Sequence, residues 1–167
     1  MTTNPSPRDP RGSDPAGVSP VLATVLCTVG FFALAVFGLG ALSVATDSDI
    51  IATPGLGQGP GVGGMLGALV AFALLLLASL RRPRPSFSAA VAVALTSALA
   101  HLLVVWVVTT SVTSSFLLAT AVAGDLVRNG ASAVILLAAA VAACAGIAMR
   151  RAGAGHPRWP WERDDEE

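Results

Sequence analysis

The stretch VGGMLGALVAFALLLLASL, residues 62–80, runs for 19 residues without a charge and is followed at once by Arg81 and Arg82. At about 1.5 Å of rise per residue, a helix of this length reaches roughly 28 Å, close to the bilayer's hydrocarbon thickness of about 30 Å. A charge-free segment of this length that stops at arginines is typical of a helix that crosses a membrane.

Three further segments have the same character, residues 21–45, 87–108 and 131–149, in a chain that is 54% hydrophobic and 12% charged. Lipid offers the backbone no hydrogen-bond partner, so a spanning segment must be helical unless it belongs to a closed barrel, whose ten-residue alternation is absent. A soluble four-helix bundle would need a polar stripe on each helix, and no segment has one. The sequence therefore predicts an all-α integral membrane bundle of four transmembrane helices.

The flanking segments divide the chain into three parts. Residues 1–20 are rich in Pro, Ser, Thr and Gly, cannot bury apolar surface and are expected to be disordered. Residues 21–149 form the predicted four-helix transmembrane domain. Residues 150–167 contain two prolines and end in four acidic residues, so we expect a non-helical tail.

The arginines predict the orientation. If the amino terminus lies in the cytoplasm, nine of the ten arginines do as well, and only Arg128 lies outside. Arginine-rich loops next to spans favour the cytoplasmic side, so both termini are predicted to be cytoplasmic. The residues expected to anchor the bundle at this interface are Arg81, Arg82, Arg84, Arg150, Arg151, Trp159 and Trp161.

A secretory signal peptide is the alternative interpretation of the first segment, with Ser43, Val44 and Ala45 as a small-residue cleavage site. The apolar run is longer than the usual signal core of about 7 to 15 residues. The polar leader is also not clearly basic, because its two arginines are balanced by two aspartates. We therefore interpret the first segment as a span.

Small residues recur at four-residue spacing in two of the predicted helices. This spacing lets another helix backbone approach closely, as in G-x-x-x-G pairs. The residues concerned are Gly63, Gly67 and Ala71 in one helix and Ala138, Ala142 and Gly146 in another. These lines predict packing seams within the bundle, with an interface between copies of the chain as the alternative.

The segment between the third and fourth spans, residues 109–130, is Ser/Thr-rich at first and then apolar. It predicts either an interfacial helix capped by Ser114 or Ser115, or an extension of the fourth span. Asp125 and Arg128 are spaced to pair on one helix face, which is usually a solvated face.

His101 is the only ionisable side chain well inside a predicted span, and such residues are functional hypotheses by default. Ser97 lies one turn before it and Thr109 two turns after, giving a polar stripe that should face the bundle. A neutral histidine hydrogen-bonded to a neighbour would be structural, whereas a proton or substrate relay or a metal or haem ligand would be functional.

The few histidine, cysteine and acidic residues argue against a catalytic or metal site. No predicted span contains a carboxylate to pair with His101, and the other histidine, His156, is in the tail. Cys27 and Cys144 lie in no C-x-x-C motif and are expected to be free. No hydrolase or metalloprotease motif occurs. We predict no catalytic, cofactor or metal site and no enzyme, and a formal charge of zero argues against nucleic acid as a partner.

The amino-acid composition is also biased: the chain has no Lys, no Tyr and two Asn, and is rich in Ala, Gly, Val, Arg and Pro. In this composition and in its four spans the chain resembles the many uncharacterised small membrane proteins of high-GC bacteria. The resemblance implies a location in a bacterial cytoplasmic membrane. It rests on no motif and transfers no functional residue.

The prediction for function follows from these exclusions. A multi-pass protein with small-residue seams and an almost apolar interior fits a non-enzymatic accessory, assembly or envelope subunit that packs against another membrane protein or against itself. The alternative is an oligomeric small transporter or channel subunit, with His101, Ser97 and Asp125 lining its path.

Overall fold

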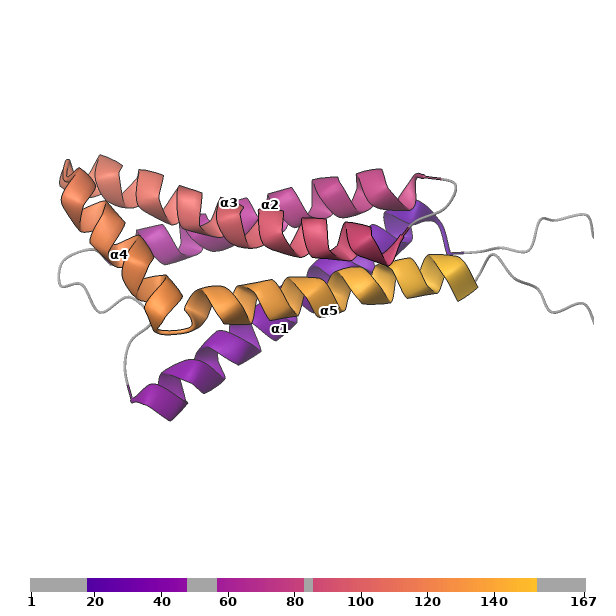
Figure 1. Cartoon of the computed structure of the whole chain (residues 1–167), viewed down its shortest axis with the longest axis horizontal. Coiled ribbons are helices and arrows are strands. Elements are labelled where there is room, and N and C mark those ends of the chain that lie inside the picture. The colour runs from indigo at the N-terminus through magenta and orange to yellow at the C-terminus, as the bar shows by residue number, and fades with distance from the viewer. Residues whose placement is uncertain (1–17, 48–56, 83–85, 153–167) are drawn as a thin grey trace, which may run out of the picture.

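The computed structural model describes residues 18–47, 57–82 and 86–152. Within these ranges the helices are α1 (Pro20–Thr46), α2 (Gly59–Leu80), α3 (Phe87–Thr113), α4 (Phe116–Arg128) and α5 (Ala131–Ala152), shown in Figure 1, and the described residues contain no strand. Helices α1, α2, α3 and α5 are each long and apolar enough to cross a membrane. The predicted all-α class with four such helices is confirmed, and the length and composition of these helices indicate a membrane protein. The orientation stays a prediction.

The helices extend past the predicted apolar runs, and polar side chains explain why. In α3 the hydroxyls of Ser111 and Thr113 donate hydrogen bonds of 2.8 Å to carbonyls one turn back, so the Ser/Thr-rich stretch stays helical. Helix α2 begins at Gly59, with Pro60 in the first turn, where a missing N–H costs nothing. Helix α1 begins at the cap residue Ser19, whose Oγ accepts a hydrogen bond from the Leu22 amide at 3.1 Å.

Helix α4 decides between the two interpretations of residues 109–130. Ser114 adopts a left-handed conformation (φ 54°) that ends α3, and Ser115 caps α4 by accepting a hydrogen bond from the Leu118 amide at 3.3 Å. A second turn at Gly130 (φ 85°) separates α4 from α5. The segment is thus a separate helix and does not prolong the fourth span. It packs against α3 and α5 at one end of the bundle (Figure 1).

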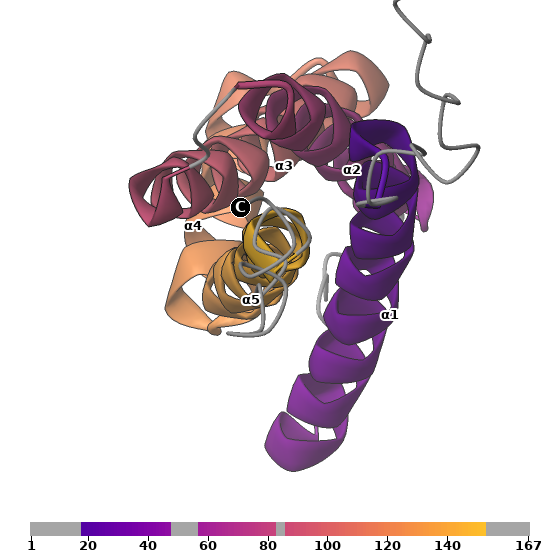
Figure 2. The same ribbon diagram turned by 90° about the vertical axis from the view of Figure 1, so that its right-hand side faces the viewer.

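The four long helices are not equally embedded in the bundle. Helix α3 packs against α2, α5 and α4, and α5 contacts every other helix. Helix α1 packs only against α2 and α5 among the described elements. Figure 2 shows that α1 diverges from the other helices along its length. We call the end where α1 and α3 begin and α2 and α5 end the arginine end, and the opposite end the α4 end.

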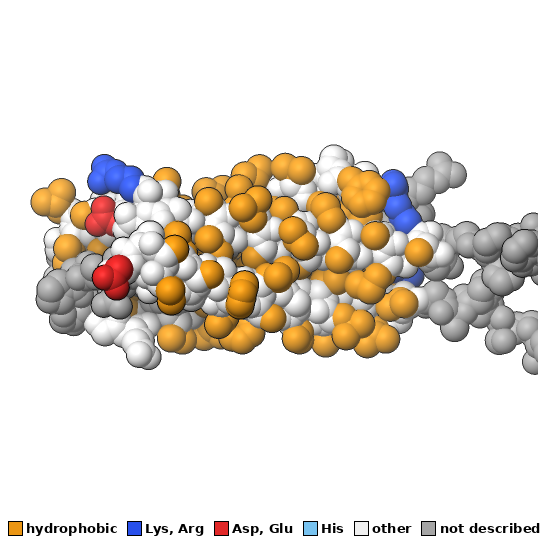
Figure 3. Space-filling model, turned by 90° about the horizontal axis from the view of Figure 1, so that it is seen from below, with side chains coloured by type: hydrophobic (Ala, Val, Ile, Leu, Met, Phe, Trp, Pro, Cys, Tyr) orange, Lys and Arg blue, Asp and Glu red, His pale blue; other side chains and the backbone are white. Residues whose placement is uncertain are grey.

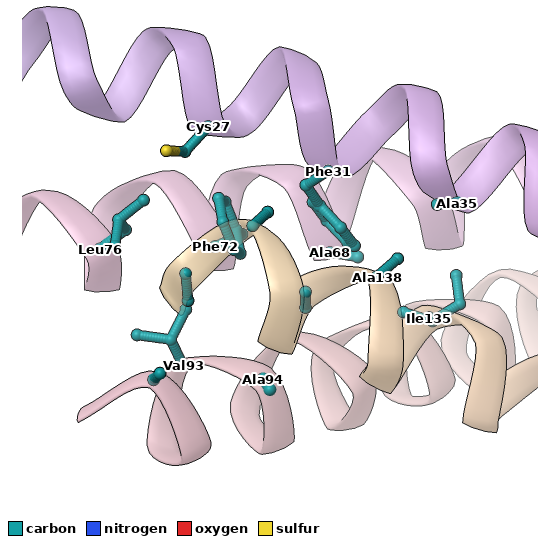
Figure 4. Packing of buried hydrophobic residues seen from close by; sticks show 14 of the residues in the cluster. Cys27, Phe31, Ala35, Ala68, Phe72, Leu76, Val93, Ala94, Ile135 and Ala138 are labelled. Carbon is teal, nitrogen blue, oxygen red and sulfur yellow. The ribbon is translucent and has the colours of Figure 1, made fainter. Parts of the chain in front are cut away.

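Two groups of buried apolar side chains hold the bundle together. The larger one joins α1, α2, α3 and α5, and its centre is the Phe31–Phe72 pair, whose ring centroids lie 4.7 Å apart (Figure 4). The smaller one lies at the α4 end and joins Val105 of α3 to Val122 and Leu126 of α4. His101 lies on α3 between the parts of the helix that belong to the two groups.

The surface of the bundle is apolar along most of its length (Figure 3). Each of the four long helices exposes large aliphatic side chains, including Val29, Leu74, Leu99 and Leu137. Such a belt would be an aggregation surface in water, but it is the expected lipid-facing surface of a membrane bundle.

Several residues of the sequence predictions fall outside the described ranges. They are Arg84, Trp159, Trp161, most of the amino-terminal segment and the tail beyond Ala152. Ser43, Val44 and Ala45, the alternative cleavage site, lie within the continuous helix α1.

Candidate functional site

Helices α2 and α3 approach each other closely, and glycine makes this possible. A Cβ added at Gly67 would lie 2.6 Å from a Val104 methyl group, and one at Gly63 would lie 3.3 Å from Val108. Both distances are tighter than ordinary van der Waals contact. At these positions the two antiparallel helices therefore meet with backbone on the α2 side, and we call this contact the glycine seam.

Gly64, which the four-residue spacing did not single out, lies deepest in the glycine seam. A Cβ there would lie 2.5 Å from a Val105 methyl group and 3.0 Å from Cδ2 and Nε2 of His101. The imidazole ring thus packs directly on the backbone of α2. The sequence signal was present, since Gly63 and Gly64 are adjacent, but only the register of α3 decides which glycine meets the histidine.

His101 itself is 5% exposed, and its Nδ1 atom is buried without a hydrogen-bond partner among the described residues. A neutral imidazole carries one N–H donor and one lone pair, so a buried nitrogen without a partner has lost its hydration without compensation. The structural role, in which a neighbouring hydroxyl or carbonyl bonds to the ring, stays a prediction, and Nδ1 has no such partner among the described residues.

The other two residues of the predicted stripe share the burial but not a network. Ser97 and Thr109 are both 0% exposed. The Ser97 hydroxyl donates to the Val93 carbonyl of its own helix at 2.7 Å, and the Thr109 Oγ1 has no partner among the described residues. The stripe therefore places three buried polar groups along α3 without any hydrogen bond that joins Ser97 to His101.

Ala138, Ala142 and Gly146, the second predicted line, are all buried on α5. A Cβ at Gly146 would lie 3.1 Å from the Sγ of Cys27 and 3.5 Å from the methyl groups of Leu76. This side of α5 therefore faces α1 and α2. Ala71, the last residue of the first line, is half-buried on α2.

The two cysteines are free and lie in different surroundings, because Cys27 is buried against α5 whereas Cys144 is exposed on the surface. Within the described ranges no three His, Cys, Asp or Glu side chains are grouped so that they could hold a metal ion. The Asp125 side chain is 60% exposed, and its Oδ1 lies 3.5 Å from Nη1 of Arg128 at the α4 end.

A surface feature that sequence reasoning missed is the later part of α1. Phe37 is 77% exposed and Val44 is 84% exposed, and both lie on a shallow, open apolar surface of this helix. The residues of this surface are Val36, Phe37, Gly40, Ala41, Val44 and Ala45, which we call the open face of α1. A Cβ added at Gly40 would meet no described atom within 4 Å. No sequence signal separates these residues from the buried apolar residues of the same helix.

The comparisons with known proteins place this architecture in a family. A family model matches residues 18–167, and its description is a family of unknown function, DUF6121. The chain belongs to this family. The DUF6121 match begins beside Ser19, the cap of α1, and covers all five helices. No curated protein and no solved structure matches the chain. Membership in DUF6121 assigns no activity.

Proposed function

We propose that this DUF6121 member is a non-enzymatic accessory or assembly subunit of a bacterial cytoplasmic membrane, and that it packs against a transmembrane helix of another membrane protein. The observation that carries the proposal is the open face of α1. The glycine seam and the α5 line are already filled from within the chain, whereas the open face has no partner among the described helices.

The two halves of α1 differ in a way that fits this role. The first half buries Ala23, Cys27 and Phe31 against the bundle. The later half contacts α5 through Gly38, where an added Cβ would lie 2.6 Å from Val134. Its other side, the open face, points away from the bundle.

Small residues make the open face suitable for a helix. Lipid tails are as apolar as leucine, so helices associate in a bilayer through close packing rather than through hydrophobic burial. Gly40, Ala41 and Ala45 would let a partner backbone approach closely, and Phe37 and Val44 flank them. The open face therefore offers a second helix a line of close approach.

Crosslinking in native membranes, followed by affinity purification in mild detergent and mass spectrometry, tests the proposal. Wild type should recover one membrane protein in near-stoichiometric amounts. Gly40→Leu should lose it, whereas Gly30→Leu should retain it, because an added Cβ at Gly30 also meets no described atom within 4 Å and Gly30 lies outside the open face. Recovery of the chain alone, as a discrete oligomer, would contradict an accessory role, and so would equal loss in both variants.

The orientation belongs to the proposal as well. The four described arginines of the arginine end favour the cytoplasm for that end, so that both termini are cytoplasmic. Cysteine labelling tests this with Pro83→Cys in a background without Cys27 and Cys144. A membrane-impermeant reagent should reach position 83 only after the membrane is opened. Labelling of position 83 in intact cells would show that both termini lie outside the cytoplasm.

A second candidate is an oligomeric transporter or channel subunit with His101 on its path. It is favoured by the partnerless Nδ1 of His101 and the partnerless Oγ1 of Thr109, which a permeating polar species would satisfy. Flux measurements on His101→Leu distinguish the two candidates. A transporter should lose flux while it remains folded, and an accessory subunit should keep its partner.

A further inference from the structure

The charged side chains of the described residues are segregated between the two ends of the bundle (Figure 3). Arg81 and Arg82 follow α2, and Arg150 and Arg151 lie in the last turn of α5, so all four are at the arginine end. The described carboxylates, Asp47 and Asp125, lie at the α4 end, where Arg128 partners Asp125. The arginine end therefore gathers four guanidinium groups, and both described carboxylates lie at the opposite end.

Two of these guanidinium groups are held in place by neighbouring helices. Nη1 of Arg150 donates a hydrogen bond to the Val18 carbonyl, just before α1, at 3.1 Å. The guanidinium carbon of Arg151 lies 4.6 Å from the ring centroid of Phe87, the first residue of α3. The end of α5 thus joins the beginnings of α1 and α3. A guanidinium that is positioned in advance loses less side-chain freedom when it binds an anion.

Other polar groups at the same end add to the positive potential. Helix α3 starts there without a side-chain cap, because the hydroxyls of Ser86 and Ser88 bond to each other at 2.8 Å. The first amides of a long helix carry partial positive charge. Nε of Arg150 is buried and has no hydrogen-bond partner among the described residues. The uncapped first amides of α3 and the guanidinium groups at this end both favour an anion with several acceptor oxygens.

We propose that the arginine end binds the phosphate headgroup of an acidic phospholipid such as phosphatidylglycerol. The four arginines lie at the end of spanning helices, at the depth where headgroup phosphates are found. Guanidinium groups bind phosphate through paired N–H donors, and basic sites between transmembrane helices are suited to acidic lipid headgroups. The lipid's acyl chains would extend along the exposed aliphatic belt beside α5 and α3.

Native mass spectrometry of the full chain, released from nanodiscs that contain equal phosphatidylglycerol and phosphatidylcholine, tests the proposal. Wild type should retain phosphatidylglycerol in preference to phosphatidylcholine. Arg81→Gln and Arg82→Gln, which alter exposed side chains, should each lower the retention of phosphatidylglycerol roughly fivefold. Arg151→Gln should do the same, and Arg151→Lys should recover part of the loss because it keeps the charge.

Arg128→Gln is the matched control, because it removes an arginine from the α4 end and should leave lipid retention unchanged. Thermal unfolding of each variant in the same detergent separates loss of lipid from loss of fold. Three results would overturn the proposal: equal retention of the two lipids by wild type, an equal loss in Arg128→Gln, or displacement of the lipid by excess inorganic phosphate.

Discussion

The glycine seam and the open face of α1 are both built from small and apolar residues, but only the seam is in contact with another helix of the chain. In the seam, Gly63, Gly64 and Gly67 are in contact with valines of α3 and with His101. On the open face, Gly40 has no described atom within 4 Å of an added Cβ. The comparison indicates that small residues in a membrane helix mark possible close approach, and that only the structure tells which approaches are already used within the chain.

The largest effect is expected at the deepest point of the seam. Gly64→Ala would place a methyl group 2.5 Å from a Val105 methyl, so the helices must separate or Val105 must move. Overpacking of this kind costs about 1–3 kcal/mol. Thermal unfolding in detergent should show a lower midpoint for Gly64→Ala and an unchanged or higher one for Gly30→Ala, whose added methyl is open.

A second substitution makes that test specific to the contact. Val105→Ala in the Gly64→Ala background removes the clashing methyl groups and should recover part of the lost stability. If Gly64→Ala unfolds at the wild-type temperature, the tight contact between α2 and α3 does not exist as described.

A smaller effect is expected at the histidine beside the same glycine. His101→Leu replaces a ring whose Nδ1 is buried without a partner, so it removes an uncompensated polar atom and keeps most of the volume. We expect the free energy of unfolding to change by no more than about 1 kcal/mol and partner recovery to persist. If His101→Leu abolishes function while fold and partner recovery are intact, the transporter candidate replaces the accessory role.

The smallest effect is expected at the ion pair of α4. The Asp125 and Arg128 side chains are 60% and 80% exposed, so solvent screens their attraction. Asp125→Asn should change the unfolding free energy by less than about 0.5 kcal/mol, as measured by denaturant titration. A loss of flux or of partner recovery in Asp125→Asn would place this residue on a functional surface and weaken the contrast between the two regions.

The sequence predicts the membrane helices well because the bilayer sets their length and excludes charge. The runs that end at Arg81 and at Arg150 could be identified from this constraint alone. The separate helix α4 could not be decided, because an apolar stretch after Ser115 suits both a new helix and an extension of the next one.

The candidate site was harder to predict for a physical reason. His101 stood out because an ionisable group in a span is rare, but its lack of a partner depends on the register of α2 against α3. The open face of α1 could not be predicted from the sequence. Residues that face lipid and residues that face the bundle are equally apolar in a membrane, so Phe37 and the buried Phe31 look alike in the sequence.

A photocrosslinking amino acid at position 44 tests the central claim most directly, with the same amino acid at position 70 as the control. Val44 belongs to the open face, and Val70 on α2 is 59% exposed but lies outside it. Our account predicts one adduct of defined mass with another membrane protein from position 44 and none from position 70. Adducts from both positions alike, or an adduct from position 44 with a second copy of the chain alone, would contradict it.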